Sequence, residues 1–233
     1  MRFENPLIEG TLLRRTRFMA EVKLRNGDEI TAHCAHAGAM IGCSEPGSKV
    51  LLSENNDPRR KLKHQLEIVF AGRTPVCIHN ARSVGVVSEA IMAGKISELA
   101  GYATIRREAN SVHAPKADLA LEGNGLRTCY LHVKNVTMAD NKVAYYPDTV
   151  SPTDGDRLTE LTDLIREGFR AVAIFVAQRG DVDTFRPADH IDPDFGQTFR
   201  DAVARGVEVL CFRAEVTRKG IELGDKIPVE MPA

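Results

Sequence analysis

Short alternating segments, separated by turn residues, fill the first third of the chain. Residues 18–24 and 29–34 alternate apolar and polar positions, and Asn26-Gly27 between them is a strong hairpin signal. Three further short apolar segments follow, at residues 49–53, 66–70 and 74–78. About five short strands at this spacing predict a small closed β-barrel, for which the OB-fold is the natural candidate.

Apolar residues recur at helical spacing from about Asn80 onward. This spacing predicts helices over residues 84–93 and 154–167, and a short helical piece over residues 96–99. Asp192-Pro193 is typical of a helix start, because Asp caps the first turn and Pro fits its first position. We therefore expect helices in the second part of the chain that the first part lacks.

Strands are expected between these helices. Residues 171–177 are continuously apolar, which is typical of a buried central strand, and residues 207–212 predict another strand. Strands that alternate with helices favour a mixed sheet flanked by helices. We therefore predict an α+β protein with two domains, an OB-like β-barrel over residues 1–80 and an α/β domain over residues 81–233.

One predicted hairpin, over residues 116–137, concentrates reactive side chains. Gly123-Asn124-Gly125 supplies residues that accept a positive φ in a short turn. The second strand alternates, so His132 and Lys134 project from the same face. A tight hairpin brings Asp118 of the first strand near that face. The expected result is a carboxylate, an imidazole and an ammonium clustered where two strands end.

Composition and charge narrow the protein class. The chain has 233 residues with ordinary apolar and charged fractions, and no apolar segment approaches membrane-spanning length. No charged-then-apolar leader opens it, so a cytoplasmic protein without a membrane partner is expected. The five cysteines are scattered without a CxxC pair, which indicates neither a zinc ribbon nor a disulfide framework. The pattern does not specify an oligomeric state.

Basic residues form local clusters in a chain whose net charge is only −1. The densest is Arg59-Arg60-Lys61, and Arg14 and Arg15 lie on the first predicted barrel strand. OB-folds bind nucleic acid with a charged face and aromatic platforms, and here aromatic residues are few. We therefore expect these cations to contact the DNA backbone, with strong salt dependence and little sequence preference. A solvated charged loop remains the alternative for each cluster.

Several segments, in order, resemble the sugar fermentation stimulation protein family. They are HCAHAGAMIGCSEPGSKV at 33–50, DPRRKLKHQLEIV at 57–69, ISELAGYATIRRE at 96–108, CYLHVKNVT at 129–137, YPDTV at 146–150 and GVEVL at 206–210. The resemblance covers nearly the whole chain. It implies an N-terminal OB-fold joined to a PD-(D/E)xK nuclease-like domain, and it implies DNA binding with a regulatory role in sugar metabolism.

The nuclease-like resemblance also implies a metal site. Asp118 matches the first acid of that fold, Lys134 matches its Lys, and His132 stands where the fold has Glu or Asp. Glu98 or Glu108, from the upstream segment, would complete a metal set with Asp118 and His132. The implied metal is Mg²⁺ or Mn²⁺, but Mg²⁺ prefers oxygen ligands and imidazole suits Mn²⁺ or Zn²⁺ better. The substitution therefore either changes the metal or removes it.

Other departures from the family pattern point to a degenerate site. After Tyr146-Pro147-Asp148 the family has basic residues, whereas this chain has Asp154 and Asp156. The leading prediction is a non-sequence-specific DNA-binding protein. The alternative is a metal-dependent nuclease or phosphodiesterase acting on nucleic acid or a nucleotide, with Asp118, His132 and Lys134 as catalytic residues. A binding module on an inactive scaffold, with a plain ion pair between Asp118 and Lys134, also remains open.

Overall fold

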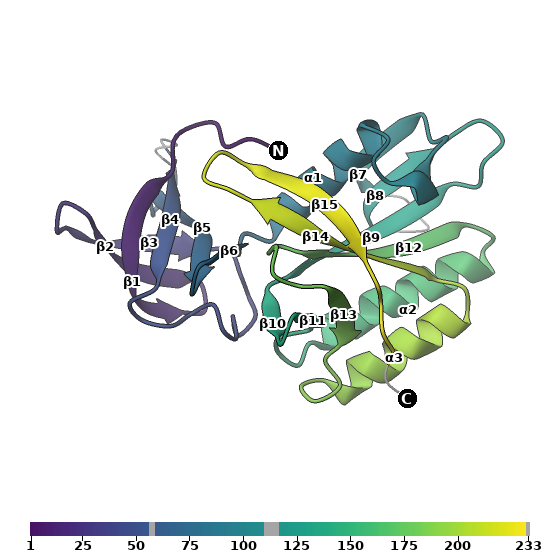
Figure 1. Ribbon diagram of the computed structural model, residues 1–233. Helices are drawn as coiled ribbons and strands as arrows, with labels where there is room; N and C mark the ends of the chain where they lie inside the picture. The colour runs from purple at the N-terminus through teal and green to yellow at the C-terminus, as the bar shows by residue number, and fades with distance from the viewer. Residues whose placement is uncertain (56–58, 110–116, 232–233) are drawn as a thin grey trace.

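The structure, a computed structural model, describes residues 1–55, 59–109 and 117–231, apart from the side chains of residues 108 and 109. A barrel built from the first part of the chain lies beside a larger sheet that carries the helices (Figure 1). Within these described ranges, no helix is long and apolar enough to cross a membrane.

The first sheet closes into a barrel. Its strands are β1 (Ile8–Thr16), β2 (Met19–Leu24), β3 (Glu29–Cys34), β4 (Lys49–Glu54), β5 (His64–Ala71) and β6 (Thr74–Cys77). They pair in the order β3-β2-β1-β4-β5-β6, and a parallel pairing between β3 and β5 closes the ring. Leu12, Val22 and Leu66 point inward and are fully buried. The OB-like barrel predicted from the alternation is confirmed.

The second sheet is mixed. Its strands are β7 (Thr104–Ala109), β8 (Ala117–Glu122), β9 (Cys129–Val136), β12 (Arg170–Ala177), β14 (Glu208–Val216) and β15 (Ile221–Ile227). They pair in the order β15-β14-β12-β9-β8-β7, with β9, β12 and β14 parallel. A small third sheet contains β10 (Met138–Asp140), β11 (Val143–Tyr146) and β13 (Thr184–Pro187). The buried central strand predicted over residues 171–177 is β12.

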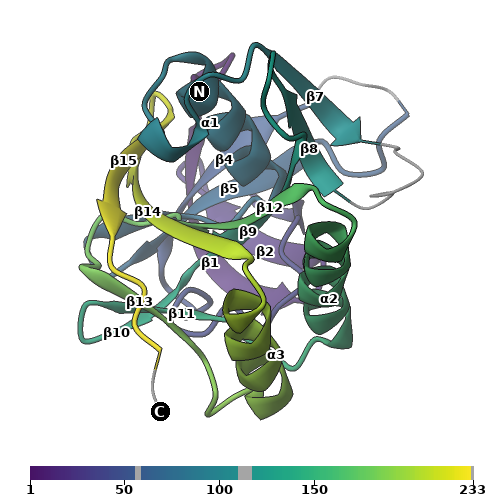
Figure 2. The ribbon, with the colours of Figure 1, turned by 90° about the vertical axis from the view of Figure 1, so that its right-hand side faces the viewer.

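Helices cover both faces of the mixed sheet (Figure 2). One face packs against α1 (Ala81–Met92), which the short 3-10 helix η1 (Ser97–Leu99) follows, and the other against α2 (Pro152–Arg166) and α3 (Pro193–Ala204). Asp192 caps α3 as predicted, since its side chain accepts a hydrogen bond from the Phe195 N–H at 2.9 Å. The first turn of α1 was not predicted, because Arg82 and Ser83 are held there by polar contacts that an apolar pattern does not register.

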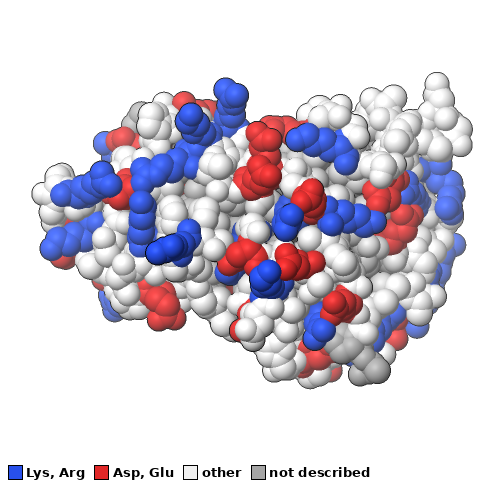
Figure 3. Space-filling view, in the orientation of Figure 1, with Lys and Arg blue, Asp and Glu red and all other residues white. Residues whose placement is uncertain are grey.

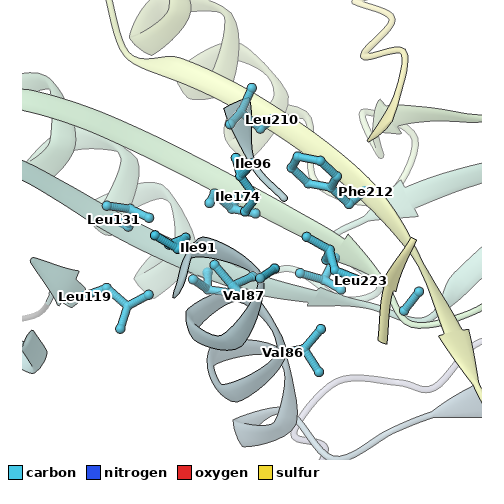
Figure 4. Packing of buried hydrophobic residues seen from close by; sticks show 14 of the residues in the cluster. Val86, Val87, Ile91, Ile96, Leu119, Leu131, Ile174, Leu210, Phe212 and Leu223 are labelled. Carbon is cyan, nitrogen blue, oxygen red and sulfur yellow. The ribbon is translucent and has the colours of Figure 1, made fainter. Parts of the chain in front are cut away.

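The barrel and the mixed sheet share one hydrophobic core. Leu51 and Ile68 of the barrel belong to the same buried cluster as Val87 of α1, Leu131 of β9 and Ile174 of β12. Figure 4 shows Val87, Leu131 and Ile174 close together between α1 and the sheet. All five cysteines are free and buried. Because the two parts share a core, the structure does not test whether they fold as separate units, and the division at residue 80 stays a prediction.

A fully buried carboxylate also joins the barrel to α1. Glu67 of β5 accepts hydrogen bonds from Arg82 Nη2 at 2.6 Å and from Arg82 Nε at 3.0 Å, and it lies 3.1 Å from His79 Nδ1. Burial raises the pKa of Glu67, but hydrogen bonds and charges from His79 and Arg82 outweigh it and lower the pKa to about 2. Glu67 is therefore ionised at neutral pH and holds Arg82 in place.

We expect Glu67→Gln to flatten the acid dependence of stability. A carboxyl whose pKa is about 2 when folded, against an ordinary 4.5, stabilises the fold above about pH 4.5, and this stabilisation is lost as the pH falls toward 2. Between about pH 6 and about pH 3, the variant should lose roughly 2 kcal/mol less unfolding free energy than the unmodified chain. Urea unfolding at the two pH values measures the difference, and equal losses would contradict the role of Glu67.

Candidate functional site

The β8–β9 hairpin brings together the residues that sequence analysis placed at its centre. The antiparallel register that pairs Leu119 with Leu131 puts Asp118 beside His132 on the face toward α2. Asp118 Oδ2 lies 3.5 Å from His132 Nδ1 and accepts a hydrogen bond from the Val133 N–H at 2.8 Å. The carboxylate and the imidazole therefore meet on adjacent strands, as the alternation indicated.

Lys134 projects from the same face, but its partner is not the one that sequence analysis considered. Lys134 Nζ donates to Asp154 Oδ1 at 2.5 Å, and Asp154 lies in the first turn of α2. Burial lowers the pKa of Lys134, and the charge of Asp154 opposes this shift. Burial raises the pKa of Asp154, but Lys134 outweighs it and the pKa is lowered. The ion pair between Asp118 and Lys134, one of the alternatives left open by the sequence, is replaced by this one.

His132 is buried beneath the helix, with only 1 % of its side chain exposed. Arg157 Nη1 lies 3.3 Å from His132 Nδ1, and Glu160 Oε2 lies 3.5 Å from His132 Nε2. Because a guanidinium only donates hydrogen bonds, we assign Nδ1 as the acceptor and place the ring proton on Nε2, facing Glu160. Two groups from α2 thus enclose the ring on both sides.

Asp118 is stabilised in its ionised form. Burial raises its pKa, but groups around it, among them the Val133 N–H and the charge of Arg157, outweigh this effect, so the pKa is lowered. Arg157 Nη1 lies 3.7 Å from Asp118 Oδ1. One guanidinium therefore lies near both the carboxylate and the imidazole.

A cleft of about 580 Å³ lies between a barrel loop and this face of the sheet. Arg17 and Gly38 line it from the barrel, and Asp118 and Lys134 line it from the hairpin. Among the residues that the structure describes, its charged lining residues are the cations Arg17, Lys134 and Arg157 and the carboxylates of Asp118, Asp148 and Asp154. The charges of the lining therefore balance.

Asp148 holds the barrel loop against the second part of the chain. This role was not predicted from the sequence, either for Asp148 or for His36. Asp148 Oδ2 lies 2.9 Å from His36 Nε2 and accepts a hydrogen bond from the Met40 N–H at 2.8 Å, while His36 Nδ1 lies 3.1 Å from Asn80 Oδ1. Burial raises the pKa of Asp148, but His36 and Met40 outweigh it and lower the pKa. His36 and Asp148 are 112 positions apart, so no local pattern marks the contact.

The upstream acids do not add a metal ligand to the described cluster. Glu98 pairs with Lys226 on β15, the edge strand opposite β7, because η1 points its carboxylate toward that edge. Glu108 belongs to β7, and its side chain lies outside the described residues. Within the described part of the chain, no group of three or more His, Cys, Asp or Glu side chains is arranged to hold a metal ion.

The basic residues predicted to contact DNA differ in their surroundings. Arg14 forms an exposed ion pair with Glu21, Nη2 to Oε1 at 2.6 Å. Arg15 instead donates to the backbone carbonyls of residues 17, 36, 38 and 39, so it holds the loop that lines the cleft. The remaining three, Arg59, Arg60 and Lys61, are exposed between β4 and β5.

Comparison with known families gives a match along almost the whole chain. The model of the sugar fermentation stimulation protein RE domain matches residues 81–220, and the model of the SfsA N-terminal OB domain matches residues 12–78. A sugar fermentation stimulation protein homolog from Thioalkalivibrio sulfidiphilus is 47 % identical over 234 residues, covering 99 % of this chain and 98 % of its own length. A homolog from Paramagnetospirillum magneticum is 42 % identical over 232 residues with the same coverage.

A solved structure shares the fold. The structure of Pyrococcus furiosus SfsA in complex with Ca²⁺ superposes with a TM-score of 0.88 at 24 % identity, covering 99 % of this chain and 98 % of that chain. The pairing of an OB-like barrel with a mixed sheet, inferred above from the alternation and the helical periodicity, is confirmed by this match.

Gly38→Ala is expected to loosen the barrel loop. A Cβ at this position would lie 1.9 Å from Asp148 Oδ1, so the carboxylate would have to leave His36. We expect a loss of roughly 1–3 kcal/mol of unfolding free energy, measured by urea denaturation.

Gly155→Ala is the matched control for this substitution. Nothing lies within 4 Å of a Cβ at Gly155, and alanine is favoured over glycine in a helix such as α2. The control should be as stable as the unmodified chain or more stable. A Gly38→Ala variant that unfolds at the same urea concentration as the unmodified chain would refute the contact's role.

Proposed function

This chain belongs to the sugar fermentation stimulation protein family, and we propose that it binds DNA through the phosphate backbone without reading base sequence. The charge distribution of the barrel carries this proposal. Residues 1–80 contain 12 Lys and Arg against 9 Asp and Glu, whereas residues 81–233 contain 19 against 23. A local excess of positive charge attracts phosphates even when the whole chain is close to neutral.

The surface of the barrel supports backbone contacts. Lys and Arg side chains gather over the barrel, at the left of Figure 3. Arg59, Arg60 and Lys61, in the segment between β4 and β5, are exposed. The ion pair of Arg14 with Glu21 is exposed, and such a pair is worth little, so a phosphate can replace the carboxylate.

One aromatic residue adds a stacking surface beside the cleft. Phe18 is 47 % exposed in the turn between β1 and β2, and the guanidinium of Arg17 lies 5.0 Å from its ring centre. Arg17 also lines the cleft. An exposed ring next to cations favours contact with an unstacked base, so single-stranded DNA or a frayed end is a suitable ligand.

The alternative function, a metal-dependent nuclease, is not supported by the described residues. The Pyrococcus furiosus protein was solved with Ca²⁺, but a divalent cation does not fit the described residues of this cleft. His132 offers nitrogen where Ca²⁺ and Mg²⁺ prefer oxygen, and Arg157 already lies beside Asp118. We therefore derive no hydrolytic step. The regulatory role in sugar metabolism that the family implies would follow from DNA binding.

Removing two exposed cations from the barrel should weaken binding to all DNA sequences equally. We expect Arg60→Ala/Lys61→Ala to lower affinity for duplex and single-stranded DNA several-fold. The slope of log K against log salt should become shallower by about 2, one unit for each lost phosphate contact. Fluorescence anisotropy between about 50 mM and about 200 mM salt, with two unrelated DNA sequences, measures both quantities.

Two exposed cations of the second part serve as the matched control. Arg166→Ala/Arg205→Ala removes the same charge from the C-terminal ends of α2 and α3, which lie away from the barrel (Figure 1), and should leave the slope unchanged. An equal effect of the two double variants would mean that net charge, not the barrel, governs binding. Failure of the unmodified chain to bind DNA at low salt would reject the proposed function.

A further inference from the structure

The chain supplies its own positive charge beside Asp118. Arg157, one turn into α2, brings Nη1 to 3.7 Å from Asp118 Oδ1 and to 3.3 Å from His132 Nδ1. An ion held jointly by the Asp118 carboxylate and the Nδ1 lone pair would need this same space. The guanidinium is permanently charged and cannot become a ligand.

The orientation of His132 separates the two nearby carboxylates. Nδ1 faces Asp118 at 3.5 Å, and Nε2 faces Glu160 at 3.5 Å. The two ring nitrogens point away from each other, so the carboxylates lie on opposite sides of the ring. With the ring 1 % exposed and fixed from both sides, one ion cannot reach both carboxylates.

The charges of the cluster also disfavour a divalent cation. Asp118 and Glu160 contribute two negative charges, and Arg157 contributes one positive charge. Lys134 and Asp154 cancel each other. Among the described residues this leaves one net negative charge, and Asp118, Asp154 and Glu160 each already lie beside a cation or the imidazole, which is less than hard cations such as Ca²⁺ and Mg²⁺ require.

We propose that this cleft does not bind a divalent cation. Arg157 is the counter-ion of Asp118, and the imidazole of His132 replaces the oxygen ligand that such a cation would need. The inference stands apart from DNA binding, because the barrel surface can hold phosphates whether or not the cleft holds an ion. The inference also implies that one substitution can create a metal site, since a carboxylate at position 132 would supply the missing oxygen ligands.

His132→Glu tests the inference directly. The variant places a second carboxylate beside Asp118 and raises the net negative charge of the cluster from one to two. Isothermal titration of the chelator-treated full chain with CaCl₂ should give no saturable binding for the unmodified chain. For His132→Glu it should give a dissociation constant of about 10⁻⁴–10⁻³ M, the range of weak protein calcium sites.

Two matched variants show whether the gained site is the expected one. His132→Gln removes the imidazole without adding charge and should not bind Ca²⁺. His132→Glu/Asp118→Asn lacks the first carboxylate and should lose the gained binding at least about tenfold. Ca²⁺ binding that is equal in all three variants would place the ion elsewhere and overturn the inference.

Arg157→Ala provides a second test of the inference if His132→Glu does not fold. This variant leaves Asp118 and the Nδ1 lone pair exposed to the same space, and nitrogen-tolerant Mn²⁺ should then raise its unfolding temperature more than Ca²⁺ does. The unmodified chain should respond to neither ion. Saturable metal binding by the unmodified chain that Asp118→Asn abolishes, or no gain in any folded variant, would overturn the inference.

Discussion

A carboxylate removed from water needs a positive group or several hydrogen-bond donors in place of the water. Four carboxylates of this chain meet that need with a partner from another element: Glu67 with Arg82, Asp148 with His36, Asp154 with Lys134 and Asp118 with Arg157. The first two hold the barrel against the rest of the molecule, and the last two form a wall of the cleft between them. The same constraint therefore shapes both the fold and the candidate site.

The charges inside the cleft neutralise each other, and this gives the two parts of the chain different roles. The charge of Lys134 is balanced by Asp154, and the charge of Arg157 is shared between Asp118 and His132. Little positive potential remains there to attract a phosphate, so attraction has to come from the barrel, where cations exceed carboxylates. The barrel loop that borders the cleft is held by Arg15, which donates hydrogen bonds to the carbonyls of His36 and Gly38.

Local patterns predicted the parts of this structure that local forces determine. The Asn26-Gly27 hairpin, the Asp192 cap and the alternation that puts His132 and Lys134 on one face are all present. The partner of Lys134 and the contact of Asp148 with His36 depend on where α2 and the barrel loop pack, which no segment encodes alone. Glu98 was misplaced for the same reason, since the path of η1 carries it to β15.

The most direct test of this account is the affinity of the full, chelator-treated chain for a short DNA, measured at one salt concentration with EDTA and then with Ca²⁺, Mg²⁺ or Mn²⁺ at matched ionic strength. The account predicts the same affinity in all four conditions, because barrel cations and not a bound ion hold the phosphates. A divalent ion that is needed for binding, or that strengthens it about tenfold or more, with the effect lost in Asp118→Asn, would contradict it.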